Sequence, residues 1–146
     1  MPNIIDTELA WMAGFFDGEG CIRLSKLKRY GNRQGIHYGR GVTISNTDRD
    51  SLEIFKLYFG GSIQLHTKQS LKHKTAYKWV ACSRMADNFI DKVYPYLKLK
   101  RNRADLFIKF KNLFCKEGLD LKENDYTERN ELVEQMHIAN FRGVRI

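Results

Sequence analysis

The sequence predicts an α+β fold, in which helices cover one face of a four-stranded antiparallel sheet. Helical and alternating patterns follow one another along the chain as helix, hairpin, helix, hairpin and then three more helices. The turn within each hairpin is short and polar, which favours antiparallel pairing. With 146 residues the chain can bury one core. We therefore expect a single domain over residues 1–146, with an αββαββα core at about 7–115 and a C-terminal helical extension at about 116–146.

The first predicted helix, ending at about Phe16, is apolar on nearly every side. A helix without a polar face must be buried, either in the core of its own chain or between two chains. The small residues Ala10, Ala13 and Gly14 would let a second backbone approach it closely. Two acids that alternate with two glycines follow directly, over residues 17–20. Carboxylates at the negative end of a helix dipole need a compensating cation, and a metal ion is the obvious candidate.

Two β-hairpins follow, separated by a helix that ends at the glycine pair 60–61. In each hairpin, apolar and polar side chains alternate, as in a strand with one buried and one wet face. The alternating segments are residues 21–29, 37–46, 62–68 and 75–82. Later helices are predicted from about Arg84, after the basic run of residues 98–103, and over about 127–139.

Charge is distributed unevenly along the chain, whose formal net charge is +8. The first 20 residues hold four acids and no Lys or Arg, whereas residues 21–80 hold twelve Lys or Arg and three acids. Positive charge concentrated in the strand region predicts a polyanionic partner. Charge alone does not distinguish such a partner from a surface of solvated lysines.

Other classes of protein are disfavoured. Cys21, Cys82 and Cys115 are far apart and odd in number, so the sequence predicts neither a zinc site nor a disulfide framework. No basic and apolar leader begins the chain, and no apolar run reaches membrane-spanning length. We expect a soluble intracellular protein, in a prokaryotic cytoplasm or an organelle, without a membrane partner.

The nine residues from Met12 to Gly20, MAGFFDGEG, resemble the LAGLIDADG motif of homing endonucleases. Met12 replaces the leading Leu, two Phe replace Leu-Ile, and Glu19 replaces the last Asp while keeping its carboxylate. The predicted order of elements is similar to the αββαββα core of that family, whose concave sheet forms a saddle along DNA with helices on its other face. The resemblance extends over about residues 7–115.

The resemblance implies a site-specific, intron-encoded type of endonuclease. A single motif per chain implies a homodimer that makes a double-strand cut in a long, nearly palindromic DNA target and leaves 3′ overhangs. Two alternatives on the same scaffold are a maturase that binds intron RNA and a non-catalytic DNA-binding regulator. Retention of Glu19 and Lys100 argues against the regulator, because binding alone needs neither, but no residue separates the endonuclease from the maturase.

For the active site, the resemblance implies that Glu19 is a ligand of Mg²⁺, assisted by the carbonyl of Gly18. Mn²⁺ is expected to substitute, and Ca²⁺ to bind without supporting cleavage. Lys100 resembles a basic residue that polarises the scissile phosphate or orders solvent; Lys98 or Arg101 takes this role if the register slips. Asn46 matches a position that holds the attacking water, and equally suits a cap for the following helix.

The remaining predicted positions form two surfaces, a dimer interface and a DNA-binding face. The predicted dimer interface comprises Ala10, Ala13, Gly14 and Asp17, the last as a brace for the helix end or a second acid behind the metal. Strand residues on the polar face are the types that read base edges, and the turns would hold phosphates, although each could simply be solvated. The predicted DNA contacts are Arg23, Ser25, Arg29, His37, Thr43, Ser45, Gln64, His66, Lys68 and Lys78 on the strands, with Arg33, Lys72 and Lys74 in the turns.

Overall fold

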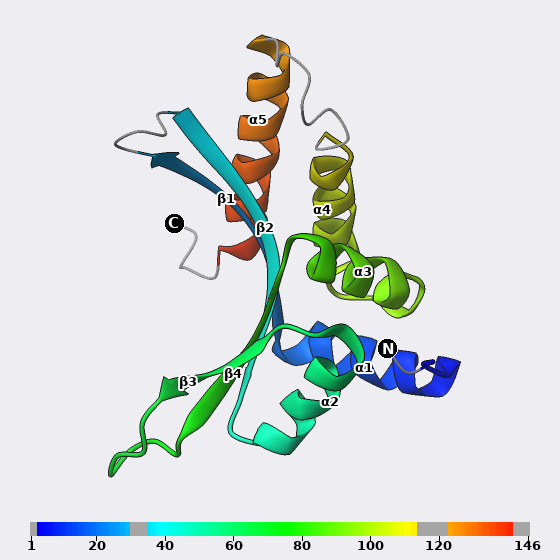
Figure 1. The fold of residues 1–146 in the computed structure, drawn as a ribbon, viewed down its shortest axis with the longest axis vertical. Coiled ribbons are helices and arrows are strands. Elements are labelled where there is room, and N and C mark those ends of the chain that lie inside the picture. Colours follow the sequence, from blue (N-terminus) through cyan, green and yellow to red (C-terminus); the bar gives the residue numbers. More distant parts are fainter. Residues whose placement is uncertain (1–2, 30–34, 114–122, 142–146) are drawn as a thin grey trace.

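A computed structural model confirms the α+β architecture and describes residues 3–29, 35–113 and 123–141. One curved antiparallel sheet has helices packed on its convex face, and its concave face is open (Figure 1). The strands are β1 (Gly20–Arg29), β2 (Gly35–Asn46), β3 (Ser62–Thr67) and β4 (Ala76–Cys82). The helices are α1 (Asp6–Glu19), α2 (Arg49–Phe59), α3 (Ser83–Val93), the 3₁₀ turn η1 (Tyr94–Tyr96), α4 (Arg101–Leu113) and α5 (Glu123–Asn140).

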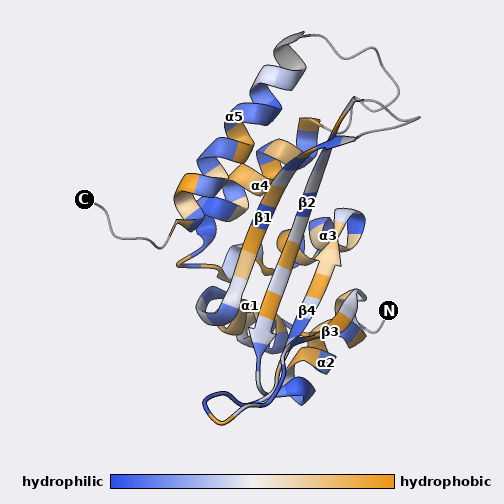
Figure 2. Cartoon of the chain, turned by 90° about the vertical axis from the view of Figure 1, so that its left-hand side faces the viewer, coloured by the Kyte–Doolittle hydropathy of each residue, from blue (hydrophilic) through white to orange (hydrophobic). Residues whose placement is uncertain are grey.

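The strands lie in the order β1-β2-β4-β3, which places the two hairpins side by side. Ile22 pairs with Val42, and Ile44 pairs with Trp79. All four of these side chains are fully buried, so they mark the face that packs against the helices. Since side chains alternate along a strand, the neighbouring residues in sequence face the open side. Figure 2 looks onto that open face, with β1, β2 and β4 in front of α1, α3 and α4.

Aromatic rings form the centre of the core. The ring of Phe89, on α3, lies 5.0 Å from Phe16, 5.0 Å from Phe59 and 5.2 Å from Trp79, measured between ring centroids. Edge-on pairs at these spacings add to the free energy gained by burying the rings. The indole N–H of Trp79 donates a hydrogen bond to the Gly60 carbonyl at the end of α2, so this large side chain has no unpaired polar atom. The core thus joins α1, α2, α3 and β4.

The first helix differs from its prediction in where it ends. It continues to Glu19, and β1 begins at the very next residue, Gly20. A side chain at Gly20 would overlap the ring of Phe16 and lie 2.7 Å from its carbonyl oxygen, so only glycine fits this turn. Its own chain does not bury the helix on every side, because Ala10 and Gly14 are exposed while Ala13 is fully buried, so burial of the exposed side between two chains stays a prediction.

The C-terminal helix α5 packs along α4 and the outer strand β1. It begins at Glu123, earlier than the predicted start at about Thr127. Asn130 accepts a 2.7 Å hydrogen bond from the hydroxyl of Tyr38, and a guanidinium nitrogen of Arg129 donates one of 3.1 Å to the Leu113 carbonyl. None of the described helices is long and apolar enough to cross a membrane.

Candidate active site and nucleic-acid interface

The end of α1 presents two oxygen donors at the surface. Gly18 and Glu19 are exposed, and the space beside Gly18 is open, with no atom within 4 Å of where a Cβ would lie. Carbonyl groups in the last turn of a helix have no following turn to donate to them, so they can accept other partners. A carboxylate and a helix-end carbonyl therefore share one exposed turn.

Asp17 and Lys100 are buried next to this turn, at 8% and 3% exposure. The Asp17 carboxylate accepts hydrogen bonds from the backbone N–H groups of Lys98 (2.8 Å) and Lys100 (3.1 Å). The ammonium of Lys100 donates a 2.5 Å bond to the backbone carbonyl of Asp17. Thus the basic segment before α4 and the end of α1 come together, although they are more than 80 residues apart in sequence.

Two positions of the predicted dimer interface are covered by their own chain. Ala13 is fully buried within its own chain, and the carboxylate of Asp17 is taken up by the backbone of residues 98–100. The exposed small residues of α1 are instead Ala10, Gly14 and Gly18, which are four residues apart. Positions spaced in this way lie on one side of a helix. Nothing in the described chain lies within 4 Å of where a Cβ on Gly14 or Gly18 would be.

Asn46, the last residue of β2, lies at the same end of the sheet as the last turn of α1, because Gly20 at the start of β1 pairs with Ile44. Its side-chain oxygen accepts a 2.8 Å hydrogen bond from the backbone N–H of Asp48. This is an Asx turn before α2, but the N-cap position of α2 is held by Asp48, so Asn46 does not cap the helix as the alternative expected. A role for Asn46 in holding water stays a prediction.

The concave face is polar and basic. The four described strands carry no Asp or Glu. Among their Lys and Arg residues, Arg23 and Lys78 alternate with buried side chains and face the concave side, whereas Arg40 faces the helices and pairs with Asp87 of α3. On this face Arg23, His37 and Gln64 are exposed, whereas Ser25, Ser45 and Lys78 are half-buried. Arg23 lies opposite Gly41, which has no side chain to block its reach across the sheet.

For several predicted DNA contacts, the exposure or the strand position differs from that expected from simple alternation. Thr43 faces the concave side but is only 5% exposed, because it lies in the middle strand between Cys21 and Val80. A bulge between Leu65 and Thr67 pairs Thr67 with Ala76, so the simple alternation that placed His66 and Lys68 on one face ends there. Both residues are exposed. The side chain of Arg29 and all of Arg33 lie outside the described residues.

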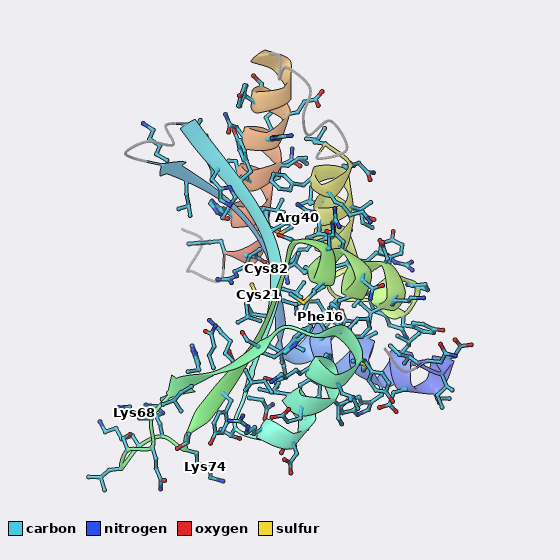
Figure 3. All side chains as sticks on the ribbon, in the orientation of Figure 1. Phe16, Cys21, Arg40, Lys68, Lys74 and Cys82 are labelled. Carbon is cyan, nitrogen blue, oxygen red and sulfur yellow. The ribbon has the colours of Figure 1, made fainter. Side chains whose placement is uncertain are left out.

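The β3–β4 hairpin carries a basic tip beyond the body of the protein. Lys68 and Lys74 lie at its far end in Figure 3, and Lys72 between them is also exposed. The hydroxyl of Ser70 accepts hydrogen bonds from the N–H groups of Lys72 and His73, which gives the tip a defined turn. The ammonium groups therefore project from an ordered loop.

A groove of about 680 Å³ follows β1 and β2 on the concave side. Its floor includes Arg23, His37 and the free thiols of Cys21 and Cys82, which Figure 3 shows near the middle of the sheet. His137 and Asn140, at the end of α5, form one rim. Sequence reasoning missed these two residues, because no local pattern indicates that a C-terminal helix reaches the edge of a sheet.

The exposed turn of α1 fits a hard divalent cation. Glu19 and Gly18 offer only oxygen atoms, which Mg²⁺ prefers. Within the described residues no cluster of three or more His, Cys, Asp or Glu side chains is present. A site with few protein ligands suits Mg²⁺, because this ion retains several waters and binds phosphate oxygens.

The sequence matches one known protein family over most of its length. A sequence model described as LAGLIDADG endonuclease matches residues 12–114, which include the second half of α1 and the Lys98–Lys100 segment. The chain belongs to the LAGLIDADG homing endonuclease family. A search of curated proteins gives no match.

Solved structures of LAGLIDADG homing endonucleases share the fold. I-CvuI, crystallised with its target in the presence of Ca, superposes with a TM-score of 0.77 at 19% identity, over 96% of this chain and 86% of that one. The archaeal intron-encoded I-Vdi141I, complexed with DNA, gives 0.76 at 21% identity, over 96% and 88%. I-SmaMI, bound to cleaved DNA, gives 0.72 at 18% identity, over 97% of this chain but only 47% of that one.

Proposed function

We propose that this protein is a site-specific DNA endonuclease that acts as a homodimer and cuts both strands of its target, with Mg²⁺ bound at Glu19. The observation that carries the proposal is the exposed Glu19 carboxylate on a turn that is held next to Lys100, at one end of a sheet face without acidic residues. A phosphodiester can approach such a carboxylate along a basic surface. Membership of an endonuclease family supports the same chemistry.

The concave face supports DNA as the substrate. Twisted β-ribbons fit the major groove, where Arg recognises guanine and Gln recognises adenine with two hydrogen bonds each. Arg23 and Gln64 are exposed on this face and are suited to such contacts. Lys68, Lys72 and Lys74 on the hairpin tip would bind phosphates without regard to sequence. Both I-CvuI and I-Vdi141I were crystallised with DNA, which supports this assignment for the present chain.

Two chains are needed because each supplies one Glu19 and a duplex has two strands. Ala10, Gly14 and Gly18 leave room along α1 for the same helix of a second copy. A twofold axis along these helices would bring the two Glu19 residues near one another. The match to only 47% of I-SmaMI agrees with one copy corresponding to half of a functional unit.

The twofold axis also determines the target and the product. A symmetric dimer reads the same half-site twice, so the target would be long and nearly palindromic. Glu19 residues near the axis would face two phosphates across the minor groove. Across the minor groove, the facing phosphates of the two strands are staggered in the 3′ direction. Cleavage at these phosphates would therefore leave 3′ overhangs.

Glu19 and the Gly18 carbonyl would hold the metal ion at each site. When bound, Mg²⁺ lowers the pKa of a coordinated water and offsets charge that develops on the phosphate. Mn²⁺ would substitute, while Ca²⁺ would support binding only. Asn46, at the adjacent end of β2, would orient the attacking water.

Cleavage of a randomised plasmid library by wild type and Glu19→Gln tests the proposal. With Mg²⁺, wild type should linearise one class of sequence, and the variant should bind that class without cutting it. With Ca²⁺, both proteins should bind and neither should cut. A wild-type protein that binds DNA or intron RNA but never cuts would contradict the proposal.

A further inference from the structure

Asp17 and Lys100 hold each other through bonds that run in both directions. The two carboxylate oxygens of Asp17 each accept one backbone N–H from the other segment, at Lys98 and at Lys100. In return, the Lys100 ammonium donates to the carbonyl of Asp17 itself. Each segment therefore carries a charged side chain whose polar atoms bond to the backbone of the other.

Both charged groups are buried, so their hydrogen bonds must compensate for the loss of water. Removing a carboxylate or an ammonium from water is unfavourable unless the group is hydrogen-bonded or paired. Asp17 is 8% exposed and Lys100 is 3% exposed, so solvent contributes little to either. The Lys100 ammonium also lies at the negative end of the α1 dipole, where a cation is favoured. The hydrogen bonds to residues 98–100 therefore connect the last turn of α1 to the segment before α4.

We propose that Asp17 and Lys100 are positioning residues for the metal site. Their reciprocal bonds hold the last turn of α1, and with it the Glu19 carboxylate and the Gly18 carbonyl, in one geometry relative to the sheet. Lys100 acts through the Asp17 carbonyl rather than by contact with the scissile phosphate, since its ammonium is buried and bonded within the chain. The role of Glu19 in this proposal rests on the proposed function.

We call the three hydrogen bonds between Asp17 and residues 98–100 the clamp. Two substitutions break the clamp, one in each of the two segments that it joins. Asp17→Asn replaces one acceptor oxygen with an NH₂ group, which cannot accept from a backbone N–H. Lys100→Met keeps an unbranched apolar chain but removes the donor to the Asp17 carbonyl. Asp105→Asn is the matched control, because Asp105 accepts a 2.6 Å bond from the Tyr94 hydroxyl on η1 and makes no such bond to α1.

The first measurement is amide hydrogen exchange, which needs neither metal nor DNA. Asp17→Asn and Lys100→Met should both speed exchange at residues 18–20 and at Lys98 and Lys100, whereas Asp105→Asn should leave residues 18–20 unchanged. The double variant should speed exchange at residues 18–20 by less than the two single effects combined, because the bonds that the two changes remove belong to one coupled contact between the same two segments. Where Lys100→Met does not fold, Lys100→Gln is measured in its place.

The second measurement is the Mg²⁺ concentration needed for half-maximal cleavage of the selected target. Both clamp variants should require about 10- to 100-fold more Mg²⁺, the usual effect of losing a group that orients a metal ligand. Wild-type exchange at residues 18–20 in Lys100→Met would overturn the proposal. So would a reduced maximal rate of cleavage with an unchanged Mg²⁺ requirement in Lys100→Met, because that result assigns Lys100 to the phosphate. If wild type never cuts, the proposed function fails, and exchange alone decides the clamp.

Discussion

The side-chain amide of Asn140 donates a 2.7 Å hydrogen bond to the carbonyl oxygen of Ile22, which joins the end of α5 to the outer strand of the sheet. β1 is an edge strand, and an edge exposes backbone groups that lack a neighbouring strand. The bond satisfies one of these groups. It also fixes the end of α5 at the rim of the concave groove, where His137 and Asn140 lie.

Asn140→Leu should therefore destabilise the protein by about 1 kcal/mol, the net value of a typical hydrogen bond. Urea unfolding measures this difference in free energy. Gln135→Leu, at an exposed position of the same helix, is the control and should change stability little. Equal stability of Asn140→Leu and wild type would show that the Asn140 bond does not hold the helix end.

Gly14→Arg should weaken dimerisation at least about tenfold, or about 1.4 kcal/mol, because a long charged side chain would occupy the space left for a second α1. The fold of each chain should persist, since no atom of the described chain lies within 4 Å of that space. Asn88→Arg adds the same charge at an exposed position of α3 and should leave dimerisation intact. Sedimentation equilibrium distinguishes the two variants. A Gly14→Arg protein that dimerises like wild type would rule out this helix as the interface.

Arg23→Ala and Lys72→Ala should affect DNA binding in different ways. Arg23 is placed to read a base, so its loss should cost about 1–3 kcal/mol and relax specificity at one position of each half-site. Lys72 is placed to bind phosphate, so its loss should weaken binding to all sequences and reduce the salt slope by about 0.9 per contact. Titrations at several salt concentrations check both. Lys92→Ala, at an exposed position of α3, should change neither the specificity nor the salt slope.

Tyr38 should make the fold sensitive to alkaline pH. Burial raises the pKa of Tyr38 above its ordinary value of 10.0; the nearby charge of Arg129 offsets part of this effect, and Tyr126 adds to it. Above pH 10 the unfolded chain releases this proton while the folded chain keeps it, so the free energy of unfolding falls as pH rises.

Urea unfolding at pH 8 and pH 10.5 should therefore show a larger loss of stability for wild type than for Tyr38→Phe. Tyr38→Phe also lacks the bond to Asn130, so the change with pH is compared rather than the stability itself. The raised pKa values of Tyr94 and Tyr96 contribute equally to both proteins. Parallel pH profiles would remove Tyr38 as the cause.

The fold was predictable because its signals are local. The period-2 alternation of residues 21–29 and 37–46 predicts both the strands and their buried face, and Ile22 and Val42 lie on that face as expected. Glu19 is exposed, but it lies in the last turn of α1, whereas the two glycines beside it predict a turn after the helix. Local pattern was therefore sufficient for the αββαββα core.

Features that depend on distant contacts were not predictable. Apolarity on every side of α1 predicts complete burial, but the sequence does not say that its own chain covers Ala13 and leaves Gly14 open. The bulge at His66 shifts the register by one residue, which no alternating pattern signals. The bonds of Asp17 to residues 98–100 span 81 and 83 positions, so they required the folded chain to be seen.

We expect each Glu19 of the dimer to serve the cutting of one strand. The use of one Glu19 per strand is tested most directly with a purified heterodimer of one wild-type chain and one Glu19→Gln chain, the two carrying different affinity tags, incubated with Mg²⁺ and a supercoiled plasmid that contains the selected target. We predict that the heterodimer converts the plasmid to the nicked open circle and stops there, whereas the wild-type homodimer gives linear DNA. Linear DNA from the heterodimer, at the rate of wild type, would contradict the account.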